Sequence, residues 1–148
     1  MANWPFAFRP LPGRFGNQLE FADTAIGTGG TSVANSATTT VLIPTPNTKT
    51  YVDRVSIAAI TPAASTGAVT VQFFKQSGAT KTALTAATSI KSDVLTGANP
   101  AVYAVAITGA DPARLCQAGD ILLVDIVAAG TVSTQPTLSL QVAYSVIS

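Results

Sequence analysis

The segment at residues 138–146 constrains the fold most, because apolar and non-apolar positions alternate along it. Every second residue is large and apolar, and the residues between them are polar or small (Leu138, Leu140, Val142, Tyr144 and Val146 against Ser139, Gln141, Ala143 and Ser145). Successive side chains of a β-strand point to opposite faces, so this pattern places all the large apolar residues on one side. The alternation predicts an antiparallel strand with one face against a core.

Five further segments have a β-strand pattern, at residues 38–43, 51–60, 69–73, 102–107 and 121–127. The last two are dense apolar runs, typical of central strands that are covered on both faces. The pattern is weaker between residues 79 and 96, where we predict one short strand at 85–91. Residues 111–115 predict a single helical turn, because Pro112 suits the first helical position after an Asp111 cap.

No segment has the length and periodicity of an ordinary helix, and Gly or Pro interrupts the chain about every 10–20 residues. No internal repeat is convincing, which argues against a solenoid or a propeller. The sequence therefore predicts an all-β fold, an antiparallel β-sandwich of seven or eight strands, formed by residues 31–148.

Residues 1–30 differ from the rest in composition and predict an extended N-terminal arm. Proline and glycine are dense there, and Gly27–Gly30 reads as a hinge. The arm either folds back over its own domain or docks onto another subunit; we favour docking, because termini are seldom ordered unless they are tied down. Aromatic residues would supply contact area and arginines charged contacts. The candidate protein-binding residues are Trp4, Phe6, Phe8, Arg9, Arg14, Phe15 and Phe21.

The chain carries few charges, with Lys+Arg 8 and Asp+Glu 7 among 148 residues. Small neutral residues take their place: 25 alanines, 21 threonines and 11 serines. A free monomer usually relies on a charged surface for solubility, so we expect other subunits to cover much of this one. A net charge of +1 without a basic cluster argues against nucleic acid as a partner.

The residues needed for common catalytic and metal sites are missing. There is no histidine, and the single cysteine, Cys116, has no histidine to activate it. The seven carboxylates are scattered, and Asp120, directly after Gly119, predicts a turn rather than an acid–base pair. We therefore expect no enzyme activity, no cofactor and no metal. No signal peptide or membrane span is apparent, which predicts a protein made and kept unprocessed in the cytoplasm.

Three segments following the aromatic arm resemble a known family. Val41-Leu42-Ile43-Pro44, Tyr51-Val52-Asp53-Arg54-Val55 and Leu115-Cys116-Gln117-Ala118-Gly119-Asp120-Ile121 are similar, in character and order, to segments of head decoration (cement) proteins of tailed bacteriophages. The resemblance spans most of the chain. It implies a jelly-roll-like sandwich on the capsid exterior, often trimeric, that clamps neighbouring major capsid subunits. It transfers no catalytic or ligand-binding residue to this chain.

The leading hypothesis is therefore a structural virion protein that stabilises the capsid lattice non-covalently. Its expected partners are the major capsid protein and its own copies, with a homotrimer favoured and a dimer as the alternative, and with neither nucleic acid nor membrane. It would be made in the host cytoplasm and end on the capsid exterior. The alternatives are a tail- or fibre-associated β-sandwich with a receptor-binding role and, less favoured without an export signal, a bacterial surface or pilus subunit.

Overall fold

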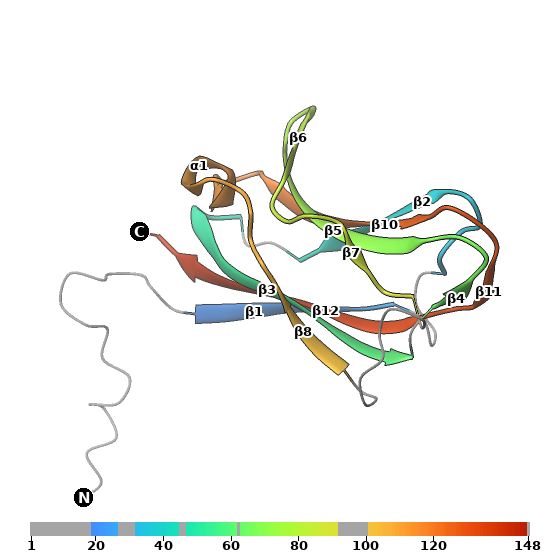
Figure 1. Ribbon diagram of the computed structural model, residues 1–148. Helices are drawn as coiled ribbons and strands as arrows, with labels where there is room; N and C mark the ends of the chain where they lie inside the picture. Colours follow the sequence, from blue (N-terminus) through green and yellow to red (C-terminus); the bar gives the residue numbers. More distant parts are fainter. Residues whose placement is uncertain (1–18, 27–31, 45–46, 62, 92–100, 148) are drawn as a thin grey trace, which may run out of the picture.

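A computed structural model (Figure 1) describes residues 19–26, 32–44, 47–61, 63–91 and 101–147, with the backbone alone at 19–26, 58–60 and 101–104. These residues form twelve strands and one helical turn. The elements are β1 (Leu19–Ile26), β2 (Thr38–Ile43), β3 (Thr50–Thr61), β4 (Ala64–Ser65), β5 (Val69–Ser77), β6 (Thr80–Ala83), β7 (Thr88–Ser89), β8 (Ala101–Val105), α1 (Asp111–Arg114), β9 (Leu115–Cys116), β10 (Ile121–Ala128), β11 (Val132–Thr134) and β12 (Thr137–Val146).

The strands form two antiparallel sheets stacked as two layers (Figure 1). Sheet A has the order β1-β12-β3-β8, with β9 added beside β3. Sheet B has the order β2-β10-β5-β6, with β7 added beside β5. A small third sheet joins β11 and β4 at one end of the sandwich, and α1 lies at the other, called the α1 end below. The all-β prediction is confirmed, and eight strands make up the two main orders.

The strand pairs are nested along the chain. The pair β5–β6 is innermost, β3–β8 encloses it, β2–β10 encloses that pair, and β1–β12 joins the two ends of the described chain. Neighbouring pairs in this nest lie in alternate sheets. The chain therefore folds like one long hairpin wound across two layers.

The core lies between the sheets and consists of their inward-facing side chains. β12 contributes Leu138, Leu140 and Val142, all at most 1% exposed, as its alternation predicts. Sheet B contributes the odd residues of β5 and the even residues of β10 (Val69, Val71 and Phe73; Leu122, Val124, Ile126 and Ala128). Both layers are thus amphipathic at period two, which is what holds a sandwich together.

A bulge in β3 changes which of its residues face the core. Between Val52 and Val55, β3 has one more residue than β12 opposite it. Both of these valines are fully buried, although strict alternation would put them on opposite faces. The bulge therefore turns Tyr51 out of the core towards α1.

The strand predictions at 38–43, 51–60, 69–73 and 121–127 are confirmed, with β5 continuing to Ser77. The predicted strand at 85–91 is wrong as drawn: β7 covers Thr88 and Ser89 alone, and an unpredicted strand, β6, precedes it. Gly78, with a φ of 57°, makes the turn that returns the chain into β6. β6 contains a single apolar residue, an alanine, so alternation gave no signal there.

The prediction that residues 102–107 and 121–127 form central strands covered on both faces also needs correction. β8 was predicted to be central but is an edge strand among the described residues, since sheet A ends with it. β10 is central in its sheet, yet its outward residues Ile121 and Val127 remain 40% exposed. One face of β10 is therefore open in the single chain.

The helical turn forms where it was predicted but with a different cap. Ala110 occupies the N-cap position and makes no side-chain capping bond. Asp111 lies inside the first turn, where its carboxylate accepts a hydrogen bond from Tyr51 instead.

β1 lies within the range predicted to form the arm. Its backbone is extended, as expected for the arm, but it pairs with β12 over eight residues, from Leu19 opposite Ser145 to Ile26 opposite Leu138. Residues 1–18 lie outside the described part of the chain.

Gly67 and Gly130 let two loops approach closely at the end of the sandwich opposite α1. A Cβ on Gly67 would lie 2.8 Å from the carbonyl carbon of Ala129 and 2.9 Å from the amide nitrogen of Gly130. Both are backbone atoms, so the loops would have to separate. We expect Gly67→Ala to destabilise the protein by about 1–3 kcal/mol in urea unfolding. Gly78→Ala, where no atom lies within 4 Å, is the control and carries only the strain of its positive φ, of order 1 kcal/mol. Equal losses in the two variants would contradict this explanation.

Candidate functional site

The outer face of sheet B is the candidate protein-binding surface. We define it by the outward side chains of β2, β10, β5 and β6. The register places these residues side by side across the sheet. They are Thr38, Thr40, Leu42, Ile121, Leu123, Asp125, Val127, Thr70, Gln72, Phe74, Gln76, Lys81 and Ala83.

Five of the side chains on this face are large and apolar. Leu42 is 63% exposed, and Ile121 and Val127 are each 40% exposed; these are the exposed large apolar residues of the described chain. Leu42, Leu123 and Phe74 stand opposite one another on β2, β10 and β5, forming one row across the strands. Leu123 is only 3% exposed because its neighbours cover it. Exposed apolar residues gathered on one face are typical of an interaction surface.

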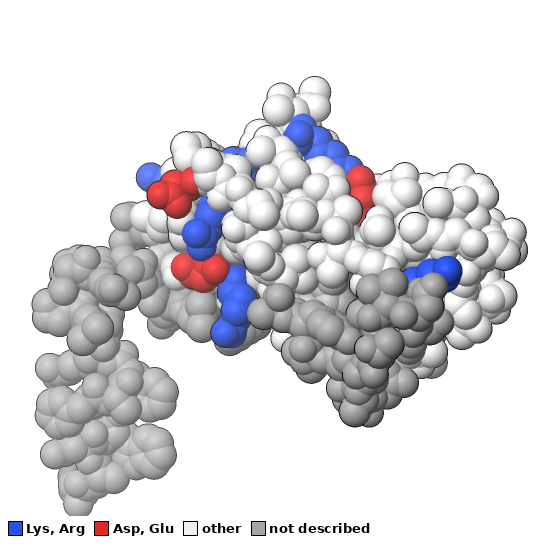
Figure 2. All heavy atoms as spheres, viewed as in Figure 1, with Lys and Arg blue, Asp and Glu red and all other residues white. Residues whose placement is uncertain are grey.

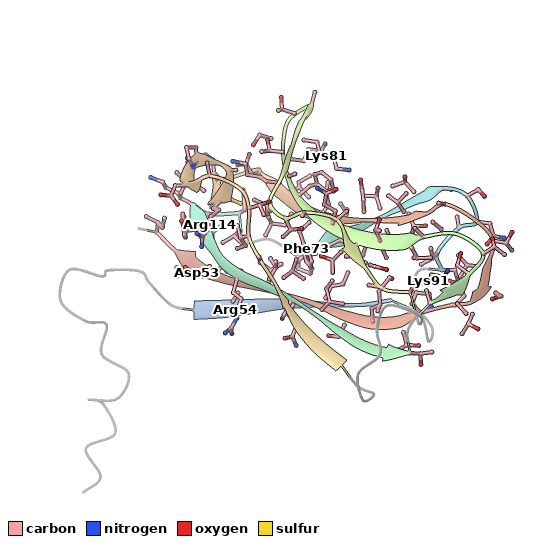
Figure 3. The ribbon with its side chains drawn as sticks, in the orientation of Figure 1. Asp53, Arg54, Phe73, Lys81, Lys91 and Arg114 are labelled. Carbon is pink, nitrogen blue, oxygen red and sulfur yellow. The ribbon has the colours of Figure 1, made fainter. Side chains whose placement is uncertain are left out.

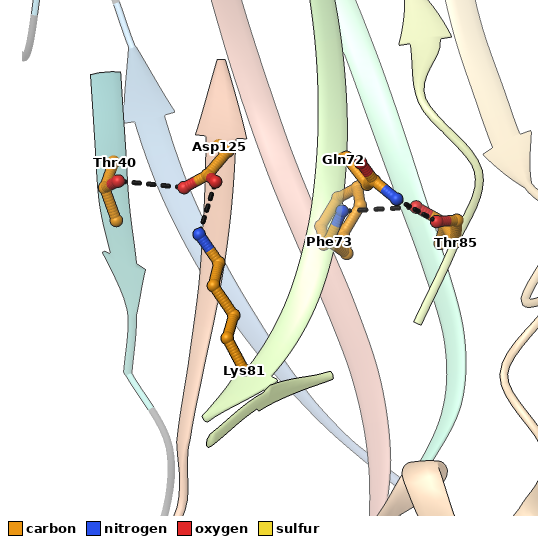
Figure 4. Close-up of polar contacts among 6 residues, drawn as sticks. All are labelled: Thr40, Gln72, Phe73, Lys81, Thr85 and Asp125. Atoms are coloured by element: carbon orange, nitrogen blue, oxygen red, sulfur yellow. Dashed lines mark hydrogen bonds and ion pairs between the residues drawn. The ribbon is translucent and has the colours of Figure 1, made fainter. Parts of the chain in front are cut away.

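The one carboxylate on this face is already neutralised (Figure 4). Asp125 accepts a hydrogen bond from the Thr40 hydroxyl at 2.8 Å and forms an ion pair with Lys81. The Lys81 ammonium also lies 4.3 Å from the centre of the Phe74 ring. The three contacts tie β2, β10, β5 and β6 together and leave the face without a free charge among its described residues.

β2 forms an open edge of sheet B, and the hydrogen-bond pattern shows which of its groups are free. The Ala128 amide donates to the Ala37 carbonyl at 3.0 Å, and these two residues lie directly opposite each other. Hydrogen-bonded and non-bonded pairs alternate in an antiparallel ladder, so the odd residues of β2 bond to β10. The N–H and C=O groups of Thr38, Thr40 and Leu42 therefore face away from β10. Within the described part of the chain, β2 pairs with β10 alone.

Among the described residues, this edge has none of the usual forms of protection. Soluble proteins shield an edge strand with charged side chains, an internal proline, a bulge or a covering segment. β2 has the sequence TTTVLI, without charge or proline, and pairs in regular register along its whole length. Such a strand is a template for another strand.

The α1 end of the molecule gathers charged side chains (Figure 2). Arg114, the last residue of α1, is one of them. Its guanidinium donates to the carbonyls of Val52 (2.9 Å) and Asp53 (3.2 Å), and lies 4.5 Å from the Tyr51 ring centre. Figure 3 shows Arg114 and Asp53 side by side where β3 begins, with Arg54 beyond them. Arg114 fastens α1 to β3, so its role here is structural.

Tyr51 and Lys75 complete this attachment. The Tyr51 hydroxyl donates to Asp111 at 2.8 Å, and this bond, with desolvation, raises the pKa of Tyr51 above its ordinary value. The Lys75 ammonium donates to the carbonyls of Pro112 (3.0 Å) and Leu115 (2.9 Å), satisfying acceptors at the end of the turn. The charged groups of Asp111, Lys75 and Arg114 are therefore hydrogen-bonded within the molecule.

Asp120 has the turn-forming role predicted for it. Its carboxylate accepts a hydrogen bond from the Gln117 amide at 2.8 Å, and its own amide donates to the Gln117 carbonyl. Gly119 adopts a φ of 90° between them. The turn brings the chain from β9 into β10.

Cys116 is fully buried, as predicted for a structural thiol. Burial raises its pKa, so the thiolate needed for nucleophilic chemistry is disfavoured. Because the pKa is higher in the folded than in the unfolded chain, the thiol contributes stability below its ordinary pKa. That contribution is lost as the pH rises through the folded value.

We expect a thiol reagent at neutral pH to modify Cys116 at least about 1,000-fold more slowly in the native protein than in denaturant. A domain stable by about 5 kcal/mol or more exposes its buried groups only that rarely. The measurement is the modification rate with and without urea. Equal rates would show that the β9 region opens without global unfolding.

No group of three or more Cys, Asp and Glu side chains among the described residues lies close enough to hold a metal ion. No helix in this part of the chain is both long and apolar enough for a transmembrane span.

The predicted binding residues stay untested by the structure. Trp4, Phe6, Phe8, Arg9, Arg14 and Phe15 lie outside the described residues. The backbone of Phe21 lies in β1, opposite Ala143. Sequence reasoning missed the outer face of sheet B, although the continuous apolar run of β10 indicated that both of its faces would be covered.

Comparison with known proteins found no match: no protein-family model, no curated protein and no solved structure matches this chain.

Proposed function

We propose that this chain is a structural protein of a virus particle, a decoration or cement protein that binds the major capsid protein lattice non-covalently. One observation carries the proposal: the outer face of sheet B presents the exposed large apolar residues of the described chain, its carboxylate is paired with Lys81, and β2 beside it is an edge strand among the described residues. A protein that worked alone in solution would be aggregation-prone with such a surface. In an assembly, neighbouring subunits would cover it.

The proposal includes a jelly-roll fold for the sandwich. A jelly roll is an eight-stranded double sheet made of two Greek keys. The nested pairs β1–β12, β2–β10, β3–β8 and β5–β6, placed in alternate sheets, support this topology. The fold is shared by proteins of many functions, so it supports the proposal only together with the surface.

Under this proposal the chain forms a homo-oligomer, a trimer by family resemblance, on the capsid exterior. The aromatic arm is its second binding element and carries Trp4, Phe6, Phe8, Arg9, Arg14, Phe15 and Phe21. The backbone of Phe21 belongs to β1 and pairs with β12 in sheet A. The docking-arm hypothesis is accordingly restricted to residues 1–18.

The experiment is fractionation of virus particles from cells that make this chain, followed by mass spectrometry of each fraction. We expect the chain to co-sediment with capsids at a fixed ratio to the major capsid protein, and to be absent from purified tails. Recovery with tails or fibres alone would favour the receptor-binding alternative. Recovery only from the particle-free supernatant would refute a virion role.

A further inference from the structure

We propose that residues 4–8 of a neighbouring copy add to the open edge of β2 as a fifth main strand of sheet B. This inference rests on the homo-oligomeric state proposed above and names the contact that forms it. The occupant is the segment Trp4-Pro5-Phe6-Ala7-Phe8, which lies outside the described residues. Addition of a strand to a free sheet edge is a common mode of peptide recognition.

The alternation of this segment matches that of the edge. The backbone groups of Thr38, Thr40 and Leu42 face the open side, and their side chains are exposed on the outer face. In an antiparallel ladder, residues directly opposite one another have their side chains on the same face. With Phe6 opposite Thr40, Trp4 lies opposite Leu42 and Phe8 opposite Thr38. Trp4 then extends the row of Leu42, Leu123 and Phe74, and Phe6 and Phe8 lie on the same outer face beside Thr40 and Thr38.

Pro5 fixes the choice between the two possible alternations. In a strand, neighbouring residues direct their N–H and C=O groups to opposite edges. When Trp4, Phe6 and Phe8 bond to β2, Pro5 and Ala7 face the outside, where the missing N–H of Pro5 costs no ladder bond. Shifting the segment by one residue would aim Pro5 at β2 and turn the aromatics away from Leu42. The proline also discourages a further strand from adding outside the arm.

Chain direction favours a neighbouring copy over the chain's own domain. β2 ends at Ile43, at the α1 end, and β1 begins at Leu19 at that same end. An antiparallel arm strand runs away from the α1 end, so in its own domain residues 9–18 would have to return along the whole edge. Pro10 and Pro12 prevent that return from being an ordinary paired strand. Extended, these ten residues reach up to about 33–36 Å, enough to bridge to an adjacent copy.

Cysteine cross-linking of the purified full-length chain tests the contact and its register. Opposite residues of a hydrogen-bonded antiparallel pair have Cα atoms about 5.5 Å apart, within disulfide range. We expect a mixture of Phe6→Cys chains and Thr40→Cys chains to form a disulfide-linked dimer under mild oxidation. The control mixture, Ala7→Cys with Thr40→Cys, should form at least about tenfold less, because position 7 faces away. Cys116 is buried and does not compete.

The double variant Phe6→Cys/Thr40→Cys separates exchange between copies from docking within one chain. We expect a ladder of cross-linked oligomers on a non-reducing gel. A monomer with a closed internal disulfide would show that the arm binds its own domain and would overturn the proposal. Absence of any cross-link, in this variant and in the mixture, would overturn it as well.

Proline substitution at matched positions tests the backbone contact by light scattering. Thr40→Pro removes an outward N–H without touching the β10 ladder, and Thr40→Ala removes the same hydroxyl but keeps the N–H. We expect at least tenfold weaker self-association in Thr40→Pro than in Thr40→Ala. In the arm, Phe6→Ala should weaken association similarly and Ala7→Pro should not. Equal effects at positions 6 and 7 would refute the alternation. These measurements need no capsid, so their outcome is independent of the particle fractionation.

Discussion

A chain that lacks residues 2–26 is expected to lose most of its stability, whereas a chain that lacks residues 2–17 keeps it. The longer deletion removes β1, which pairs with β12 over eight residues. About one ladder bond per paired residue, at a net contribution of about 0.5–1.5 kcal/mol each, gives a loss on the order of 4–12 kcal/mol. That approaches the whole stability of about 5–15 kcal/mol of an ordinary domain. Thermal melting followed by circular dichroism measures the difference.

The shorter deletion is the matched control, because it removes the aromatic arm and leaves both sheets. Its melting temperature should change little, while its self-association should fall if the arm carries the contact. Two truncations with equal melting temperatures would show that β1 does not contribute to the fold. A 2–17 deletion that unfolds would instead place the arm aromatics in the chain's own core.

The second large effect is expected at Phe73, the largest of the fully buried side chains. Its ring lies between the sheets, and its amide donates to the hydroxyl of the buried Thr85 (Figure 4). We expect Phe73→Ala to lower the free energy of unfolding by about 3–5 kcal/mol, from lost burial and the cavity left behind. The measurement is the urea midpoint, with the slope checked for constancy.

Phe74 provides a control one residue away on the opposite face. Its ring belongs to the outer face of sheet B and contacts Lys81. We expect Phe74→Ala to cost about 1 kcal/mol in stability and to weaken self-association instead. Equal destabilisation by both substitutions would mean that the outer face is part of the folding core.

The strands that alternate strongly could be predicted from the sequence, and the exceptions have physical reasons. β5 buries every second residue from Val69 to Phe73, and β12 does so from Leu138 to Tyr144 with Ala143 buried as well, so hydrophobic spacing identifies both strands. β1 has polar and charged residues at positions of both parities and lies between glycine- and proline-rich flanks, which concealed it. The β3 bulge was equally hidden, because the apolar residues Val52 and Val55 fit no single alternation.

The candidate surface was harder to predict than the fold. The pattern of β10 correctly indicates a central strand, but the sequence does not say whether its outer cover comes from the same chain. An apolar Leu42 would suit a central strand as well as an edge strand. Only the strand order shows that it lies on an edge. If the arm exchange proposed above occurs, the predicted arm and the outer face of sheet B, which was not predicted, are the two sides of one contact.

The nesting of the strand pairs also sets the order in which this chain can fold. The β5–β6 hairpin closes a loop of a few residues, whereas β1 must meet a partner more than a hundred residues away in the chain. Loop closure costs more entropy as the separation grows, so nucleation is expected at the hairpin, with zippering outward to the termini. The outermost strands join last, and a ribosome-bound chain exposes its half-finished sheets until β12 has been synthesised. Folding on the scale of milliseconds to seconds, typical of sandwiches with many distant contacts, follows from the same nesting.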